Sequence, residues 1–248
     1  MTYSIVARDP DSGHLGIAVA SRFFAVGALV PHIRARAAVA TQAFINPLWG
    51  VEGVQRLETG ETAASVLGDL AARDRGQAQR QAHMIDAQGQ IAAHTGKDCI
   101  DWAGHRVAEG VSVAGNMLSG AAVVEDTLAC YLDNMDRPFA ERLLLAMKAG
   151  EAAGGDKRGR QSAALRIHRN LDYPWIDIRA DDHEDPLAEL SRLLEVAGER
   201  YLFFAEGLAT PETFSGCDDR TPIDKAIAAA EAERRSKGVP SRSRATDA

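Results

Sequence analysis

The chain has 248 residues, of which 46% are apolar and 25% are charged, and these fractions are those of a globular protein with a buried core. Its formal charge of −7, with lysine and arginine scattered along the chain, excludes a nucleic-acid partner, because proteins that bind the phosphate backbone carry a basic face. No stretch approaches the roughly 18 apolar residues of a membrane span, and we predict a cytoplasmic protein without a membrane partner. Three cysteines, Cys99, Cys130 and Cys217, are too few and too widely spaced for a disulfide framework, which fits a reducing compartment.

The first elements along the chain are predicted to be strands. Residues 2–7 and 15–19 are apolar or alternating and flank the turn-forming residues 9–13, which is the pattern of a β-hairpin. Residues 36–42 predict a third strand. A helical stretch in two pieces then runs to about residue 81, with Gly60 between the pieces and Thr62 as a candidate cap of the second piece.

The second half of the chain mixes strands and helices. Apolar spacing and turn residues predict a hairpin over 83–86 and 90–94, a strand over 111–116, helices over 121–134 and 138–152, strands over 162–167 and 175–179, and helices over 186–197 and 226–237. This order is neither a repeated strand–helix–strand array nor an internal repeat, so we predict an α+β layered sandwich. We place one domain over residues 1–198 and a helical extension with a disordered tail over 199–248.

Thr2 heads the first strand and is the first candidate for chemistry. If Met1 is removed, its hydroxyl and the free α-amine belong to one residue, and an amine with an unperturbed pKa of roughly 7.7–8 is suited to take the proton of that hydroxyl. The alternative is that Thr2 is an ordinary β-branched residue at the start of a strand. The position alone leaves both interpretations open.

Four segments together resemble one family: MTYSIVARD at residues 1–9, AVASRFF at 18–24, ATQAF at 40–44 and GGDKRGRQSAAL at 154–165. The chain resembles the bacterial domain-of-unknown-function 1028 family (DUF1028), which belongs to the N-terminal-nucleophile (Ntn) hydrolase superfamily, over roughly residues 2–195. The resemblance implies a four-layer α/β/β/α sandwich with two antiparallel sheets, in which the first hairpin presents the nucleophile. This implied fold agrees with the element order read from the residues.

The end of the second strand also resembles the proteasome-like members of the superfamily. Ser21 and Arg22 match their pattern, whereas Ala20 stands where those peptidases place an acidic residue, and the following strand has no lysine. The departure argues against proteasome-like peptide cleavage. Arg34 or Arg36 is a candidate to supply the positive charge of the missing lysine.

Further candidates lie near strand ends. Asn116 follows a glycine and is suited to bind an oxyanion through its amide, or alternatively to stabilise a turn. Arg160 follows a Gly-Gly loop and offers a guanidinium to a carboxylate or phosphate, while we expect Asp156 and Ser162 to support the site. Thr41 and Gln42, at the end of the third strand, are expected to line the pocket of the nucleophile.

His94 and His105 lie near Cys99 in the sequence, but their spacings match no established ligand pattern, so we predict neither a metal nor a cofactor. The resulting hypothesis is a hydrolase of a small amide or related acyl compound, with Thr2 as nucleophile, Asn116 and backbone N–H groups at the oxyanion, and Arg22 or Arg160 orienting the substrate. The alternative is a non-catalytic protein of the same fold that binds a metabolite or serves as an oligomeric scaffold. We expect a small-molecule partner and a homodimer in either case.

Overall fold

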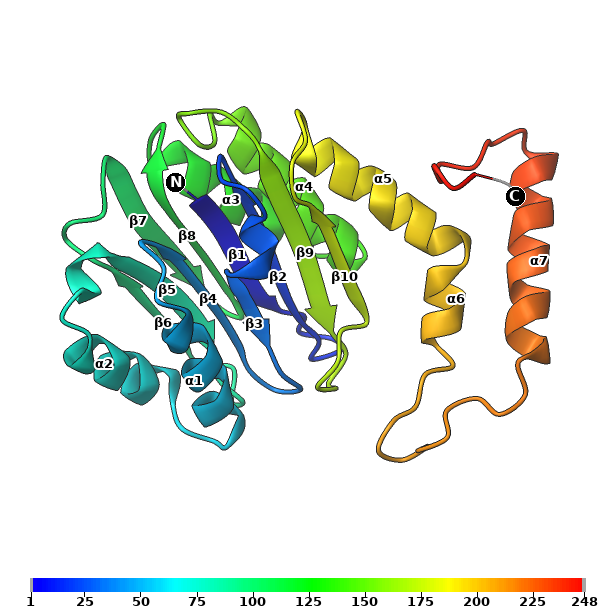
Figure 1. Ribbon diagram of the computed structural model, residues 1–248, viewed down its shortest axis with the longest axis horizontal. Coiled ribbons are helices and arrows are strands. Elements are labelled where there is room, and N and C mark those ends of the chain that lie inside the picture. Colours follow the sequence, from blue (N-terminus) through cyan, green and yellow to red (C-terminus); the bar gives the residue numbers. More distant parts are fainter. Residues whose placement is uncertain (1, 247–248) are drawn as a thin grey trace. The chain divides into compact units, whose positions relative to one another are not determined.

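The structure is a computed structural model, which describes residues 2–246 of the chain (Figure 1). The chain divides into two compact units, one ending at Leu190 and the other beginning at Ser191. This division lies within helix α5 (Pro186–Glu199), N-terminal to the boundary predicted after residue 198. All strands belong to the first unit.

The first sheet has six antiparallel strands, and β1 lies in its middle between the other strand of its hairpin, β2, and the distant strand β8. Its spatial order is β10, β9, β2, β1, β8, β7. The strands are β1 (Thr2–Arg8), β2 (Leu15–Ser21), β7 (Trp102–Ala108), β8 (Val111–Leu118), β9 (Ser162–His168) and β10 (Ile176–Ala180).

The second sheet has four antiparallel strands in the order β3, β4, β5, β6. They are β3 (Pro31–Ile33), β4 (Ala38–Ala43), β5 (Arg80–Ile85) and β6 (Ile91–Thr95). The two sheets face each other through a core in which Val6 and Ile17 of the first sheet pack with Ile85 of the second. Because alternate residues of a strand point to opposite faces, the same strands also offer an outer face to helices.

Helices cover both outer faces. The helices α1 (Pro47–Glu58) and α2 (Ala63–Arg73) pack on the second sheet, where Trp49, Leu57 and Met84 share a buried cluster. The helices α3 (Ala122–Asp133) and α4 (Phe139–Ala152) pack on the first sheet. The result is the predicted four-layer α/β/β/α sandwich with two antiparallel sheets (Figure 1).

The remaining helical elements are short turns or belong to the second unit: η1 (Val26–Ala28), η2 (Gln77–Gln79), α6 (Tyr201–Ala205) and α7 (Thr221–Ser236). The predicted cap of α2 is confirmed, since the Thr62 hydroxyl accepts a hydrogen bond from the backbone N–H of Ser65 at 3.3 Å. In the second unit, the segment after α7 has no regular secondary structure, and the Ser241 hydroxyl and the Arg242 N–H donate to the Glu199 carboxylate. None of the helices within residues 2–246 combines the length and apolar character needed to cross a bilayer.

Candidate functional site

Four polar side chains form one row across the first sheet. In the strand register Asn116 of β8 lies opposite Thr2 of β1, Thr2 is next to Ser21 at the end of β2, and Ser21 lies opposite Ser162 of β9. All four are buried. They share the face that carries Val6 and Ile17, so the row points toward the second sheet. Residues that are far apart in the sequence therefore meet at the end of the sheet where β1 begins.

Thr2 occupies the centre of this row. Its hydroxyl lies 3.1 Å from the Ser21 hydroxyl, and only 6% of the residue is exposed. The neighbouring residue Tyr3 points to the opposite face, where its hydroxyl donates to the Met147 carbonyl and the Glu151 carboxylate of α4. These contacts anchor the start of β1 to α4 through the outer face. The Thr2 side chain therefore points to the inner face, where its neighbours are hydroxyls and amides.

Asn116 is held by its amide nitrogen. Nδ2 donates to Gln81 Oε1 at 2.9 Å and, more weakly, to the Thr2 carbonyl at 3.5 Å. The bond to Gln81 orients the side chain, whereas the longer bond engages the second amide hydrogen only loosely. The Asn116 amide thus lies against the backbone of Thr2 rather than in a turn.

Gln81 of β5 is the centre of a buried amide network that the sequence did not point out. Its Oε1 accepts hydrogen bonds from the amides of both Asn116 and Gln42, at 2.9 and 2.8 Å. Its Nε2 lies within hydrogen-bond distance of the Thr95 hydroxyl and of the Gly115 carbonyl, at 3.0 and 2.8 Å. Gln81 therefore ties the second sheet to β8, the neighbour of β1 that carries Asn116.

The same network continues to His83. The Ser4 hydroxyl donates to Gln42 Oε1 at 2.7 Å, so His83 Nε2, 2.9 Å from the Ser4 oxygen, is the protonated ring nitrogen. His83 Nδ1 then accepts from the Ser112 hydroxyl at 2.9 Å. Burial lowers the pKa of His83 to about 3, so its imidazole is neutral at physiological pH. His83 is a fixed hydrogen-bonding group on the inner face and not a positive charge beside Thr2.

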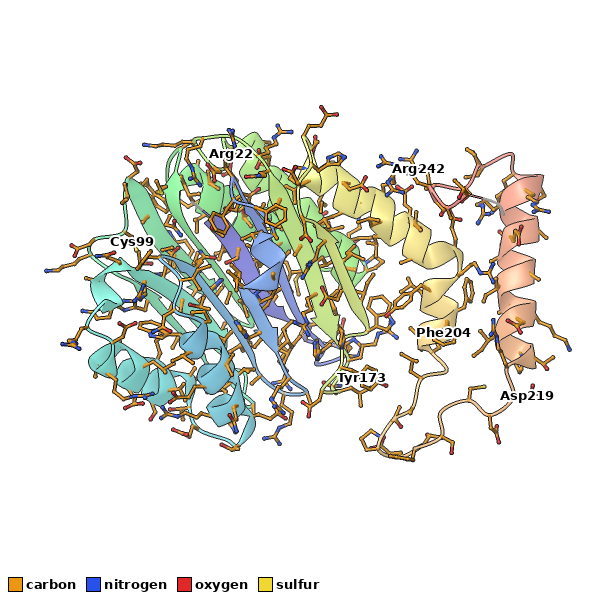
Figure 2. All side chains as sticks on the ribbon, viewed as in Figure 1. Arg22, Cys99, Tyr173, Phe204, Asp219 and Arg242 are labelled. Atoms are coloured by element: carbon orange, nitrogen blue, oxygen red, sulfur yellow. The ribbon has the colours of Figure 1, made fainter. Side chains whose placement is uncertain are left out.

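Asp156 anchors the backbone next to the row. Its buried carboxylate accepts hydrogen bonds from the backbone N–H of Arg22 at 2.7 Å and of Arg158 at 2.8 Å. The guanidinium of Arg22 donates to the Arg158 carbonyl at 2.6 Å and is otherwise exposed, at the end of the first sheet where β1 begins (Figure 2). No described carboxylate forms an ion pair with Arg22, which leaves its charge available at that end.

Ser162 and Arg160 make different contacts. The Ser162 hydroxyl donates to the Phe23 carbonyl at 2.5 Å and accepts from the Val26 N–H at 3.1 Å, so it fixes the loop that follows β2. The guanidinium of Arg160 donates to the carboxylates of Glu151 at 2.7 Å and Asp185 at 3.0 Å. Arg160 is thus engaged by two acidic groups within its own unit, whereas Arg22 is not.

Several predicted neighbours of Thr2 are not brought together with it. Thr41 points to the outer face of the second sheet, where its hydroxyl donates to the Asn46 carbonyl at 3.4 Å, while Gln42 points inward. Arg34 and Arg36 pair with Asp172 and Glu58 before β4 begins, and that end of β4 is opposite the end carrying Gln42. Neither arginine replaces the missing lysine, because the strand separates it from the row.

The histidines near Cys99 do not converge. His94 packs against Trp49 on the outer face of the second sheet, whereas His105 contacts the Thr95 hydroxyl on the inner face at 2.9 Å. Among residues 2–246, no group of three or more histidine, cysteine, aspartate or glutamate side chains is arranged to hold a metal ion. The polar row and its surroundings carry hydroxyls, amides and the exposed guanidinium of Arg22.

Comparisons with known proteins add two findings. The family described as "Family of unknown function (DUF1028)" matches residues 2–190. The crystal structure of protein SPO2555 from Silicibacter pomeroyi, assigned to the same family, is 30% identical, with a TM-score of 0.81, and the match covers 88% of this chain and 96% of that one. A search of curated proteins found no significant match.

Proposed function

Because the chain belongs to the DUF1028 family, whose function is unknown, we propose an activity from the site itself: an Ntn-type hydrolase of a small amide or related acyl compound. The observation that carries this proposal is the Thr2 hydroxyl, on the first described residue of β1, in hydrogen-bond distance of Ser21 and beside Asn116. A nucleophile at a strand end, flanked by buried polar groups, is the arrangement that acyl transfer needs.

In the proposed reaction, removal of Met1 frees the α-amine of Thr2. This amine takes the proton of Oγ1 as Oγ1 attacks the carbonyl carbon of the amide. As the bond between the carbonyl carbon and the amide nitrogen breaks, the protonated amine gives its proton to the departing nitrogen. The acyl group remains bound to Thr2 Oγ1 as an ester. Water, activated by the same amine, hydrolyses the ester and restores the hydroxyl. Ser21, 3.1 Å from Oγ1, orients the attacking oxygen through its hydroxyl.

The oxyanion requires a hydrogen-bond donor next to Thr2. The Asn116 amide hydrogen that reaches the Thr2 carbonyl at 3.5 Å is loosely held, and in the proposal it turns to the developing oxyanion. The other hydrogen keeps its 2.9 Å bond to Gln81, so the amide pivots about a fixed anchor. A donor of this kind contributes about 2.7–4 kcal/mol to lowering the barrier in other acyl transfers.

Substrate orientation is assigned to Arg22. Its guanidinium lies at the same end of the first sheet as the polar row and has no described carboxylate partner. Arg160, in contrast, donates to the carboxylates of Glu151 and Asp185. A substrate with a carboxylate or another acidic group is therefore favoured. The cytoplasmic location and the homodimer remain predictions.

The test uses protein produced without an N-terminal tag and a panel of small N-acyl amino acids and other amides. Thr2→Ala is expected to lower turnover of an accepted amide at least about a thousandfold, whereas Thr2→Ser keeps a hydroxyl and part of the activity. Thr59→Ala, which removes an exposed hydroxyl at the end of α1, is the matched control and should match the wild type. Amide turnover that survives Thr2→Ala would contradict the proposal, and amide binding without any turnover would favour the non-catalytic alternative.

A further inference from the structure

Two segments of the chain combine absence of charge with exposed apolar side chains. Residues 23–33 and 37–51 contain no Asp, Glu, Lys or Arg, although a quarter of the whole chain is charged. Six large apolar side chains in these segments are between 41% and 68% exposed. They are Phe23, Phe24, Leu29, Phe44, Leu48 and Val51, and we call them the apolar face. Depletion of charge together with exposed aromatic residues is typical of the core of a protein–protein interface.

The two segments lie against each other. The backbone N–H of Thr41 donates to the Val30 carbonyl at 3.2 Å, which joins them at the end of β4. His32 Nε2 lies 3.2 Å from the Leu29 carbonyl, and the His32 ring fills the space that a Cβ on Gly50 would occupy. Leu29 is therefore next to the turn of α1 that carries Leu48 and Val51.

The size of the apolar face matches the centre of an interface. With 53%, 62% and 68% of their surfaces exposed, the three phenylalanines alone leave about 300–450 Å² open to solvent. The largest apolar patch of a typical monomer is about 300–600 Å², and each partner of a standard interface contributes about 800 Å². Leu29, Leu48 and Val51 add further apolar surface to that of the phenylalanines. Polar residues around this apolar centre would supply the rest of a standard interface.

We propose that a second copy of this chain docks on the apolar face through a two-fold symmetric contact. In such a contact the same surface lies opposite itself, so charged residues near the axis would meet like charges. This matters for a chain with a formal charge of −7, in which two copies repel each other overall. The six apolar side chains can therefore pack against their own copies without either segment placing a like charge at the axis.

The contact would lie next to the candidate site. Phe23 follows Arg22 directly in the chain, and its carbonyl accepts the hydrogen bond from Ser162 in the polar row. The second copy would therefore cover part of the surface beside the end of β1. The proposed dimer does not depend on the chemistry of Thr2, and its test needs no substrate.

The test is sedimentation velocity of the full chain over a concentration series. The wild type is expected to sediment with twice the mass of one chain. Leu48→Asp and Phe24→Asp, one on each segment, should each raise the dimer dissociation constant at least about 30-fold, because a buried charge is introduced in both copies. Leu48 is the second residue of α1 after Asn46, where an aspartate suits the helix dipole, so this variant should fold normally.

The matched control is Leu145→Asp, which places the same charge at a 38% exposed leucine on α4, in the opposite helical layer. It should sediment as a dimer like the wild type. A thermal unfolding transition for each variant verifies that the chain is folded. A wild type that is monomeric at every concentration, or a dimer that both apolar-face variants leave intact, would overturn the proposal.

Discussion

On the inner face of the second sheet, Gln81 has both its side-chain oxygen and its side-chain nitrogen paired in hydrogen bonds. Gln81 alone receives the amides of Asn116 and Gln42 on its oxygen and bonds Thr95 and Gly115 through its nitrogen. Such a network is stable only when its members are satisfied, because an unpartnered buried polar group costs about 1–3 kcal/mol. The position of Asn116 beside Thr2 is thus a consequence of this network.

Gln81→Met is expected to lower the free energy of unfolding by about 2–4 kcal/mol. Methionine has a similar volume but removes the acceptor shared by two amides, which are then buried without it. Urea unfolding measures the effect, and Gln88→Met, at an exposed position of a turn, provides a control that should change stability little. An unchanged stability of Gln81→Met would show that the network is not intact in solution.

His83 predicts a dependence of stability on pH. Its pKa is about 3 in the folded chain and about 6.5 when unfolded, so between these values the unfolded chain binds more protons and stability falls as pH falls. The slope is up to about 1.4 kcal/mol per pH unit for this one group. His168, whose burial lowers its pKa to about 4, adds to the slope in the same direction.

The variant His83→Gln should remove its share of this dependence. Urea unfolding at several pH values between about 6.5 and 4 then gives a flatter curve for the variant than for the wild type, with the contribution of His168 remaining. Equal slopes for the two proteins would contradict a neutral, buried His83.

The sequence pointed to Thr2, Ser21, Asn116 and Ser162 separately, and the register of the strands explains why they meet. Gln81 and His83 were missed for a physical reason. Polar residues that alternate with apolar ones in a strand are typical of a surface facing solvent, and only the sheet packed opposite shows that this face is buried. Thr41 was grouped with Gln42 although neighbouring strand residues point to opposite faces.

At the scale of elements, the packing of α4 on β1 depends on a small residue. A Cβ added to Gly150 would lie 3.0 Å from both the Tyr3 ring and the Val123 carbonyl, and it would overlap the Thr127 hydroxyl. Gly150→Ala is therefore expected to destabilise the chain by about 1–3 kcal/mol, despite the higher helix propensity of alanine. Urea unfolding measures this change.

Gly68 of α2 is the matched control, because a Cβ there meets nothing within 4 Å. Gly68→Ala should stabilise the chain by about 0.5–1 kcal/mol through the helix propensity alone. Opposite signs for the two substitutions are the expected result. A stabilising effect of Gly150→Ala would mean that α4 does not pack closely on Tyr3.

The elements that the sequence predicted well carry local signals. The hairpin of β1 and β2 has turn residues between apolar runs, and α1 and α2 have caps and apolar spacing. The predicted end of the helical stretch, at about residue 81, is wrong, because α2 ends at Arg73 and β5 begins at Arg80. The strands β3 and β7 were missed, because β3 has only three residues and β7, at the edge of its sheet, has no fully buried residue. Their pairing depends on neighbours distant in the sequence, which a local pattern does not reveal.

At the scale of the whole molecule, both sheets are complete by Ala180, and the family match ends at residue 190. A chain that stops after Glu199, the last residue of α5, is therefore expected to keep the sandwich and a single cooperative thermal transition. Circular dichroism during heating checks this. A truncated chain that is unfolded at room temperature would show that residues 200–248 are needed for the fold of the first unit.

The central claim is that Thr2 is a nucleophile with a free α-amine. Its most direct test is mass spectrometry of the untagged chain after treatment with a β-lactone, an electrophile that acylates activated hydroxyls. We predict a chain that lacks Met1 and carries one acyl group, mapped by fragmentation to Thr2, and no such label on Thr2→Ala. A chain that retains Met1, or one that is labelled equally when Thr2 is replaced, would contradict the claim.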